Sequence, residues 1–542
     1  MQGLMMDVPL LITDLIRFAD RNHGETEIVS KTAEGGMHRT TYRDAHGRAK
    51  RLAKVLQALG VKLSDRVGTL AWNGYRHYEL YYAISGIGAV INTINPRLFP
   101  DQIVYISNHA ENQALFFDLT FVPLVEKLAP QLKTVKHFVL MTDRAHMPAQ
   151  TSIPNLLCYE ELMQRQNDRF EWPTFDERTA AALCYTSGTT GNPKGALFSH
   201  RSTIIHAYAA GLPDALNLSA HDCVLPVVPM FHANAWSLPY GCTMAGAKMV
   251  FPGPHLDGKS VYELMESERV TMSAGVPTVW LMLLQHLAAN KLRFTTLKRT
   301  VIGGSACPPA MIRSFQEDYG VRVFHAWGMT EMSPLGTVGT LKPKQEKLDK
   351  EAQLAVQAKQ GRGIFGVEMK IVDEEGKELP WDGKSFGNLL VKGPWIASGY
   401  MKGEGGDPLK DGWFPTGDVA TIDPDGYMQI TDRSKDVIKS GGEWISSIDL
   451  ENIAVAHPAV QEAAVIGIRH PKWDERPLVV AVKKSGQQVT KDELLKFYEG
   501  KIAKWWMPDD VVFVDELPHT ATGKLSKLTL RDKFKDYRLP GA

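Results

Sequence analysis

Apolar segments of strand length alternate with amphipathic helical segments through roughly the first two thirds of the chain. Within residues 39–60, apolar side chains recur at the spacing of one helix face, and Gly60 provides a typical helix stop. These side chains are Ala49, Leu52, Val55, Leu56 and Leu59. Residues 67–74 and 114–119 predict buried strands, and residues 77–90 predict a helix between them. The alternation predicts helices layered against sheets, an α/β fold.

From about residue 361 onward the pattern changes to short hairpins. Residues 366–380 turn at Glu375-Gly376, and residues 420–432 turn at Pro424-Asp425-Gly426, so we expect a barrel-like β subdomain here. Beyond Asp432, helical segments and apolar strand-like runs alternate over about 110 residues, which is enough for a small domain.

We therefore predict a mixed α/β protein of two domains. Residues 1–432 form a large N-terminal domain of layered α/β subdomains and the β-barrel-like subdomain. Residues 433–435 lie in a polar connector that is suited to a hinge. Residues 436–542 form a small, mobile C-terminal α+β domain.

Composition narrows the classes of function. Of the 542 residues, 44% are hydrophobic and 23% are charged, the balance of a soluble globular protein. Lys plus Arg and Asp plus Glu both number 61, so no overall field favours nucleic acid or an anionic membrane. No run of about 18 uninterrupted apolar residues is present, so no membrane span is predicted.

The N-terminal residues and the cysteines both indicate the cytoplasm. Asp7 stands where an export signal would carry basic residues, and Asp14 interrupts the apolar run, so residues 1–20 predict a short amphipathic helix. The five cysteines are odd in number and irregular in spacing, and they contain no Cys-x-x-Cys pair. This usage is typical of reduced thiols rather than of disulfides or a zinc site.

The strongest local signal for chemistry is a loop rich in hydroxyl groups and glycine. Residues 180–185 predict a buried strand, and seven of the ten residues from Thr186 to Gly195 are Thr, Ser or Gly. Backbone N–H groups, hydroxyls and the ammonium of Lys194 suit a polyphosphate, while a plain surface turn is the alternative. The loop is not a Walker A motif, because Gly195 stands where that motif has Ser or Thr.

Two other glycine patterns carry less weight. Residues 361–366 match Gly-x-Gly-x-x-Gly, but a dinucleotide fingerprint follows a strand and opens a helix. Here the pattern follows the charged, helix-prone residues 341–360, which we expect to face solvent, and it opens a strand, so we interpret it as a turn. Residues 303–307 are similar to a nucleophile elbow, but Cys307 replaces its second glycine.

The sequence YTSGTTGNPKG at residues 185–195 resembles the signature loop of the adenylate-forming superfamily. That superfamily comprises acyl-CoA synthetases, adenylation domains of peptide synthetases and beetle luciferases. Its other motifs follow in order: MFHANAW at 230–236, GGSACP at 303–308, AWGMTEMSP at 326–334, DGWFPTGD at 411–418, DRSKDVIKSGGEWIS at 432–446 and PHTATGK at 518–524. The resemblance covers nearly the whole chain and includes seven motifs in order, so it implies the fold and a reaction through an acyl-AMP intermediate.

The resemblance implies a magnesium and ATP site. Glu331 and Thr186 would hold the metal, and Thr330 would hydrogen-bond the α-phosphate; a helix N-cap partner is the alternative role of Glu331. Asp418 would bind the ribose, and the ring of Trp327, where many relatives carry Tyr, would stack on adenine. The residues implied in binding ATP or AMP are Thr186, Ser187, Gly188, Thr189, Thr190, Lys194, Gly304, Ser305, Ala306, His325, Ala326, Trp327, Thr330, Asp418, Arg433, Lys439 and Lys524.

Lys524 would be the main catalytic residue of the first half-reaction. An ammonium fixed between the substrate carboxylate and the α-phosphate cancels their repulsion. Taken alone, a lysine in a polar C-terminal loop is nearly always solvated, so only the family position implies catalysis. Lys435 resembles the residue about which the small domain swings. The resemblance places Gly441, Gly442 and Trp444 with the coenzyme A and hinge residues, the glycines giving the pantetheine arm close access to the backbone.

The implied acyl pocket lies beside His232, Trp236, Gly303, Trp327, Gly328 and Pro334. His232 would gate the coenzyme A channel or contact the substrate, with a structural histidine as the alternative. Two indoles around one pocket favour a short acid. Residues 326–334 most resemble ligases of the thioether acid 3-(methylthio)propionate, whose sulfur offers only soft contacts. A medium- or long-chain fatty acid is the alternative substrate.

The sequence therefore predicts a cytoplasmic, AMP-forming acyl-CoA synthetase whose partners are Mg²⁺, ATP, coenzyme A and a short acid. The family alone implies a homodimer. The rival classes are a carrier-protein-loading adenylation enzyme, a luciferase-like oxygenase and a catalytically inactive binding protein. Lys524, Glu331 and Asp418 are all present, which argues against the inactive protein.

Overall fold

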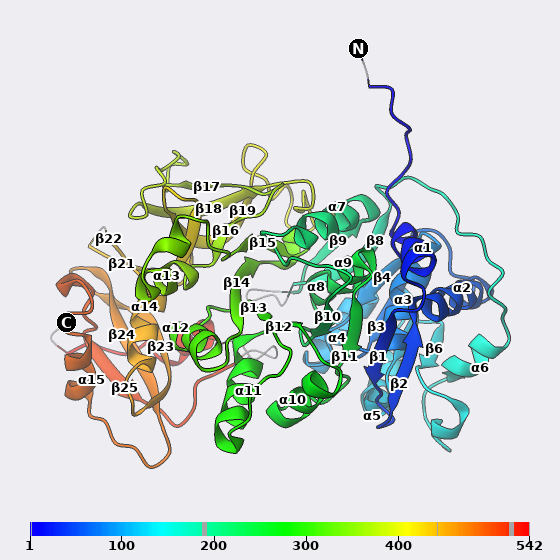
Figure 1. Cartoon of the computed structure of the whole chain (residues 1–542). Helices are drawn as coiled ribbons and strands as arrows, with labels where there is room; N and C mark the ends of the chain where they lie inside the picture. Colours follow the sequence, from blue (N-terminus) through cyan, green and yellow to red (C-terminus); the bar gives the residue numbers. More distant parts are fainter. Residues whose placement is uncertain (2, 187–191, 442, 520–524, 541–542) are drawn as a thin grey trace. The chain divides into compact units, whose positions relative to one another are not determined.

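The computed structural model describes residues 1, 3–186, 192–441, 443–519 and 525–540 (Figure 1). The chain divides into two compact units, one formed by Met1–Val367 and Lys392–Leu409 and the other by Glu368–Val391 and Lys410–Ala542. The second unit includes hairpins that the sequence places in the large domain. The sequence predicts a hinge at residues 433–435. A hinge is defined by motion between two states, so this division stays a prediction.

The first unit contains a seven-stranded sheet in the order β7-β6-β5-β3-β4-β8-β9. The strands are β3 Arg66–Leu70, β4 Val90–Thr93, β5 Asn112–Phe117, β6 His137–Leu140, β7 Leu157–Cys158, β8 Ala180–Tyr185 and β9 Gly195–Ser199. All are parallel except β9, which runs antiparallel to β8. The hydroxyl-rich loop connects β8 to the edge strand β9, so its two ends lie at this border of the sheet.

A second sheet of the first unit runs in the order β16-β15-β14-β13-β12-β10-β11-β1-β2. The strands are β1 Glu27–Lys31, β2 Met37–Thr41, β10 Cys223–Pro226, β11 Lys248–Phe251, β12 Met272–Gly275, β13 Arg299–Ile302, β14 Arg322–Gly328, β15 Leu335–Val338 and β16 Gly361–Gly363. Neighbouring strands β13 and β14 are parallel. The motif after β13, residues 303–308, and the end of the motif that continues beyond β14, residues 329–334, therefore leave the same edge of the sheet, where open α/β sheets bind ligands.

Helices of the first unit pack against these sheets and against one another. They are α1 Ile12–His23, α2 Tyr42–Ala58, α3 Tyr75–Gly86, α4 Pro100–His109, α5 Val122–Leu128, α6 Tyr159–Gln164, α7 His200–Gly211, α8 Ala233–Trp236, α9 Leu238–Ala245, α10 Gly258–Ser267, α11 Pro277–Asn290, α12 Pro309–Arg313 and α13 Lys350–Gln357. Local sequence sets their starts: the Thr41 hydroxyl caps α2 by accepting from the Asp44 N–H, and Pro100 opens α4. Helices α1, α2 and α3 are in mutual contact (Figure 1, dark blue).

The second unit is built from hairpins and a small α+β fold. Successive neighbours in its first group are β17 Glu368–Val372, β18 Phe386–Lys392, β19 Phe414–Ile422 and β20 Tyr427–Arg433. A five-stranded sheet follows, with β21 Ile438–Ser440, β22 Glu443–Ile445, β23 Val460–His470, β24 Asp474–Lys483 and β25 Asp510–Phe513. Its helices are α14 Ser447–Val455, α15 Lys491–Tyr498 and α16 Lys527–Lys533.

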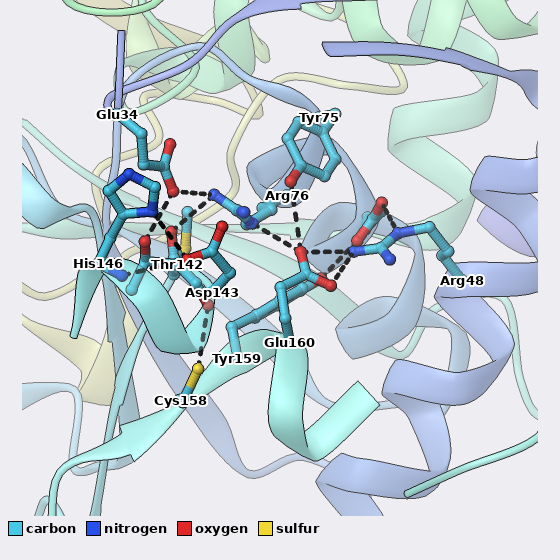
Figure 2. A network of polar contacts seen from close by, with 12 residues as sticks. Glu34, Arg48, Tyr75, Arg76, Thr142, Asp143, His146, Cys158, Tyr159 and Glu160 are labelled. Carbon is cyan, nitrogen blue, oxygen red and sulfur yellow. Dashed lines mark hydrogen bonds and ion pairs between the residues drawn. The ribbon is translucent and has the colours of Figure 1, made fainter. Parts of the chain in front are cut away.

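A largely buried network of ion pairs joins several elements of the first unit (Figure 2). Arg76 of α3 lies 2.7 Å from a carboxylate oxygen of Glu34 and 2.8 Å from one of Glu160, at the start of α6. Arg48 of α2 also pairs with Glu160, at 2.9 Å, and the Thr142 hydroxyl donates to Glu34. Buried charges need such partners, so the network holds α2, α3 and α6 in one arrangement.

Most of the predicted elements are confirmed. Helix α2 covers the helix predicted within residues 39–60, and strands β3 and β5 fall on the predicted runs. The Gly-x-Gly-x-x-Gly residues form β16 and a turn, and the next element is strand β17, so they do not open a helix. Among the described residues, every helix is too short or too polar to cross a lipid bilayer.

Several boundaries differ from the prediction. Strand β3 ends at Leu70 and β5 at Phe117, before the ends of the runs predicted at residues 67–74 and 114–119. The segment 77–90 is not one helix, because α3 ends at Gly86, Gly88 adopts a φ of +77°, and β4 begins at Val90. The N-terminal helix begins only at Ile12, while Leu4, Met5 and Met6 are exposed. Pro9 lies in this extended lead, where its ring cannot continue a helix from the preceding residues.

Candidate active site

The base of the hydroxyl-rich loop is closed by two hydrogen bonds between Thr186 and Lys194. The Thr186 N–H donates to the Lys194 carbonyl at 2.9 Å, and the Lys194 N–H donates to the Thr186 hydroxyl oxygen at 3.3 Å. The pairing of β8 with β9 thus fixes where the loop begins and ends. The predicted phosphate ligands Ser187, Gly188, Thr189 and Thr190 lie outside the described residues.

Glu331 lies in a short 3₁₀ turn, Thr330–Met332, directly after β14, and both Thr330 and Glu331 are buried. The Tyr400 hydroxyl donates to Glu331 Oε1 at 2.7 Å, and the Ala397 N–H donates to the Glu331 carbonyl at 2.7 Å. Burial and the adjoining Glu331 carboxylate raise the pKa of the Tyr400 phenol, so the phenol remains a hydrogen-bond donor at neutral pH.

The chemistry of the donors near this turn fits magnesium. A carboxylate and a hydroxyl oxygen are the hard ligands that Mg²⁺ prefers, and nucleotide-bound Mg²⁺ takes few ligands from the protein. The described residues contain no cluster of three or more His, Cys, Asp or Glu side chains suited to a metal, so a dedicated all-protein cage is absent from that part of the chain. Glu331 and Thr186 stay the predicted metal ligands.

Glycines bring the predicted adenine and acyl residues of the first unit together. A Cβ atom at Gly303 would lie 2.8 Å from the Ala326 carbonyl oxygen and 3.2 Å from the Trp236 indole, so only glycine fits there. Gly304, Ser305 and Ala306 are exposed at the end of β13, where a ligand can reach them. A Cβ atom at Gly328 would lie 1.9 Å from the Pro334 carbonyl oxygen, which explains the close turn after β14.

His325 and Trp327 sit on β14 in different environments. His325 is buried; its Nε2 accepts from the Cys307 N–H at 3.2 Å, and its Nδ1 lies 3.1 Å from the Ala358 carbonyl oxygen. Burial lowers the pKa of His325 to about 4, so the ring is neutral and braces the backbone after β13. Trp327 is mostly buried, and its ring packs on Gly336. Nucleotide contacts of both residues stay predictions.

His232 precedes a left-handed turn of the chain, and Trp236 lies within it. All five residues from Ala233 to Ser237 have φ between +42° and +60°, so α8 is a single turn of left-handed helix. The turn directs Trp236, which is partly buried, toward Gly303 and Gly304. His232 precedes the turn, and its N–H donates to the Pro229 carbonyl at 3.0 Å. The structure thus brings Trp236 to the predicted acyl residues.

The second unit brings the predicted ribose ligands together. Asp418 on β19 is the register partner of Arg433 on β20, and the Arg433 Nε lies 3.0 Å from Asp418 Oδ1. Asp418 is buried, whereas the Arg433 side chain is about half exposed. Binding of ribose hydroxyls by this pair stays a prediction.

The predicted hinge and coenzyme A residues lie close together in sequence but have separate partners. Burial lowers the pKa of Lys435; Asp436 opposes this shift, and Arg433 and Arg531 add to it. The Lys439 ammonium forms an ion pair with Glu374 and lies 5.5 Å from the ring centroid of Trp444.

Gly441, also among the predicted coenzyme A residues, has a φ of +59°, which favours glycine, and its N–H donates to the Trp473 carbonyl at 2.9 Å. Gly442 and Lys524 lie outside the described residues.

Sequence reasoning missed two residues beside the motifs. Tyr400 contacts Glu331, and its ring centroid lies 5.1 Å from the Lys194 ammonium. The guanidinium of Arg97 lies over the rings of Trp72 and of Phe231 in the MFHANAW motif, at 5.8 Å from each ring centroid. Such a cation offers a contact to an anionic part of a substrate. Neither residue stands in a motif with an obvious spacing rule, so no signal in the single sequence marks them.

Comparisons with known proteins show the family of the chain. The model of the AMP-binding enzyme family matches residues 15–401, and that of the AMP-binding enzyme C-terminal domain matches residues 449–524. The 3-methylmercaptopropionyl-CoA ligase of Ruegeria lacuscaerulensis is 57% identical, with 99% of each chain covered. The medium-chain-fatty-acid–CoA ligase of Ectopseudomonas oleovorans is 50% identical, over 99% of this chain and 98% of its own.

A solved structure supports the same assignment. The anthranilate CoA ligase AuaEII in complex with anthranoyl-AMP has a TM-score of 0.83, 26% identity and 98% coverage of both chains. The fold class predicted from the sequence, a mixed α/β protein with large and small parts, is thereby confirmed. Because the family model spans most of the chain and relatives are at least half identical over nearly all of it, this protein belongs to the AMP-binding enzyme family, as an acyl-CoA ligase that uses ATP and coenzyme A.

Proposed function

We propose that this enzyme converts a short carboxylic acid, 3-(methylthio)propionate, into its coenzyme A thioester. The observation that carries the proposal is the position of the Trp236 indole against Gly303 and Gly304. A bulky indole beside the residues that we assign to the acyl pocket favours a short chain over a long one. The relative named for the methylmercaptopropionyl thioester is 57% identical, which supports the same acid. A thioether sulfur is soft and polarizable, so an indole is a suitable neighbour.

The reaction proceeds in two displacements. In the first, a carboxylate oxygen of the acid bonds to the α-phosphorus of ATP, and pyrophosphate leaves with the electron pair of the broken P–O bond. In the second, the thiol of coenzyme A loses its proton, its sulfur bonds to the acyl carbon, and AMP leaves. Both reactants in the first step are anions, so fixed cations and hydrogen-bond donors must offset their charge.

We assign the roles as follows. Lys194 and the loop that it closes bind the terminal phosphates, and Thr330 donates to the α-phosphate. Glu331 and Thr186 hold magnesium, which offsets charge on the departing pyrophosphate when it is bound. Asp418 accepts from the ribose hydroxyls, and the Arg433 guanidinium, 3.0 Å away, holds its carboxylate in place. Lys524 places its ammonium between the two anions of the first step, and Lys435 is the hinge residue.

A medium- or long-chain fatty acid is the second candidate substrate. The 50% identical relative named for medium-chain fatty acids favours it. A thioether acid and a short fatty acid have nearly the same shape, and one methylene changes binding in an apolar pocket by only about 1–3 kcal/mol. The pocket therefore accepts acids of butyrate to hexanoate size alongside the thioether acid.

A panel of acids tests the proposal. With ATP, magnesium and coenzyme A, pyrophosphate release is measured for 3-(methylthio)propionate, butyrate, hexanoate, octanoate and palmitate. We expect the highest kcat/KM for the thioether acid and a steep fall beyond hexanoate. A higher kcat/KM for palmitate would reject the short-acid proposal in favour of the second candidate.

Product analysis in the same assays separates the rival classes. Free acyl-CoA identifies a coenzyme A ligase, whereas acyl-AMP that accumulates until a carrier protein is added identifies a carrier-loading enzyme. Pyrophosphate release that stays at background with every acid would identify an inactive binding protein.

We also propose a reducing, cytoplasmic location and a homodimer. All five cysteines are unpaired and buried, which supports a compartment that keeps thiols reduced. The dimer is carried over from the family, and light scattering of the purified protein tests it.

A further inference from the structure

A short segment of the first unit, residues 397–405, contacts both groups to which we assign the metal and the terminal phosphates. The segment holds Glu331 at two points, through the Ala397 N–H on its carbonyl and the Tyr400 hydroxyl on its carboxylate, each at 2.7 Å. A buried carboxylate with one oxygen fixed in this way keeps a single orientation for its other oxygen.

The same segment also borders Lys194. The Lys194 ammonium lies 5.1 Å from the ring centroid of Tyr400, the distance of a cation–π contact. A Cβ atom at Gly405 would lie 2.6 Å from the same ammonium, and Gly405 has a φ of +78°. Glycine at this position therefore leaves room for the ammonium and permits a backbone conformation that other residues rarely adopt.

A chain of polar contacts anchors the far end of the segment beside the loop. The His109 Nε2 lies 3.1 Å from a carboxylate oxygen of Glu404, and its Nδ1 lies 2.7 Å from the hydroxyl of Tyr185. Tyr185 is the last residue of β8 and immediately precedes Thr186. The segment is thus tied to the base of the loop at one end and to Glu331 at the other, so its position sets both.

We propose that Tyr400 is a positioning residue of the adenylation step: its hydroxyl orients Glu331 toward the metal, and its ring seats the Lys194 ammonium. The inference rests on the proposed function, because it takes from it the roles of Glu331 and Lys194. Residues that orient a metal ligand typically change metal affinity by about 10- to 100-fold when they are removed. The ring and the hydroxyl make separate contacts, so their effects can be separated.

The hydroxyl is tested with Tyr400→Phe, which keeps the ring. Binding of Mn²⁺, a spectroscopic substitute for Mg²⁺, is measured by electron paramagnetic resonance in the presence of a non-hydrolysable ATP analogue. We expect an increase of about 10-fold or more in the Kd for Mn²⁺ and a matching increase in the magnesium concentration needed for half-maximal pyrophosphate release. Saturating magnesium should restore most of kcat, and KM for ATP at that concentration should change by less than about 2-fold.

The matched control is Tyr159→Phe. Tyr159 is fully buried, whereas Tyr400 is partly buried; the Tyr159 hydroxyl donates to the carboxylate of Glu79 at 2.6 Å, within the network of Figure 2 and not at Glu331. The control should leave the Kd for Mn²⁺ unchanged even where it lowers Tm. If Tyr400→Phe binds Mn²⁺ as tightly as the wild type, or if both variants weaken it equally, the positioning role of the hydroxyl is rejected.

The contact of the segment with Lys194 is tested with Gly405→Ala, because the added methyl group would meet the Lys194 ammonium. We expect an increase of about 5-fold or more in KM for ATP with an unchanged magnesium requirement. An unchanged KM for ATP would overturn the seating of Lys194. The wild type separates these outcomes from a failure of the proposed function: a wild-type enzyme that neither binds Mn²⁺ with the ATP analogue nor releases pyrophosphate overturns the proposed function instead.

Discussion

Trp236 is the single side chain on which we expect acyl-chain length to depend, because its indole borders Gly303 and Gly304. Trp236→Ala removes the indole and should raise the kcat/KM of octanoate relative to that of 3-(methylthio)propionate by about 10-fold or more. Pyrophosphate release with the two acids measures the ratio. Trp381→Ala, which removes an exposed indole elsewhere, is the control. A ratio that stays at its wild-type value in Trp236→Ala would show that another residue limits chain length.

Gly361 shows why a literal motif match can be structural. It has a φ of +95°, and a Cβ atom there would lie 2.1 Å from the carbonyl carbon of Val338 on the paired strand β15. Gly361→Ala should therefore lower the free energy of unfolding by at least about 2 kcal/mol, measured by urea denaturation. Gly35→Ala, at a similar φ of +101° with open space around it, should cost only about 1 kcal/mol. Equal losses in the two variants would contradict a steric role for Gly361.

His325 on β14 shows that a position in a family motif does not determine which groups a side chain contacts. The family position of His325 implies a nucleotide contact, whereas both of its ring nitrogens face backbone groups of the protein. Tyr400 is the opposite case: a tyrosine after Ser398-Gly399 carries no spacing signal, and it contacts Glu331 only because the chain folds back over 69 residues. The sequence gives the chemical type of a residue, but it does not predict a contact between residues that lie so far apart in the chain.

Among the elements, the left-handed turn at α8 could not be predicted. Residues 233–237 contain no glycine, and a left-handed conformation costs an ordinary residue about 1–2 kcal/mol. Tertiary contacts hold the turn: Ala235 is fully buried, and the Asn234 amide oxygen accepts from the hydroxyl of Tyr81 at 3.3 Å. By contrast, the helix and strand periodicities of residues 39–60, 67–74 and 114–119 were sufficient to predict α2, β3 and β5, because burial enforces them directly.

The ion-pair network of Figure 2 should dominate the stability of the helices that it joins. Arg76→Met leaves the Glu34 carboxylate without its guanidinium and should lower the free energy of unfolding at pH 7 by about 3–5 kcal/mol, measured in urea. Arg17→Met, which removes an exposed pair with Asp14 on α1, should cost less than about 1 kcal/mol. A loss in Arg76→Met no larger than in this control would contradict the structural role of the network.

The pH dependence of that loss follows from Glu34. Burial opposes its ionisation, but Arg76 and the Thr142 hydroxyl together hold the pKa of Glu34 below its ordinary value. A carboxyl group with a lowered pKa in the folded state adds stability above the pKa of the unfolded chain, about 4.3, and the stability disappears as the pH falls through the folded-state pKa. The difference between wild type and Arg76→Met should therefore be largest near neutral pH and shrink below about pH 4.

For the whole molecule, the two displacements should be separable by one substitution. Lys524→Ala removes the ammonium that we assign to the first step and should lower adenylation, measured as ATP–pyrophosphate exchange, by about 100-fold or more. Thioester formation from pre-formed acyl-AMP and coenzyme A should change by less than about 3-fold. A loss confined to thioester formation would contradict the assignment, and retained thioester formation would show that the variant is folded.

The overall class of the protein was the most predictable property, because it depends on seven motifs in a fixed order rather than on any one residue. Their order implied the fold and the acyl-CoA ligase activity, both of which the comparisons confirm. The extent of the second compact unit was not predicted. Hairpins at residues 368–391 and 410–432 belong to it, and their polar turns carry no signal of which core they join.

All five cysteines are buried, and this affects how the protein can be labelled. Burial raises the pKa of Cys184 to about 11 and those of Cys223 and Cys307 to about 12, so these sulfurs are neither accessible nor ionised near neutrality. Maleimide dyes should therefore not react with the thiols of the folded wild type. A fluorophore could accordingly be attached at one chosen surface position by introducing a single new cysteine, with the native ones left in place.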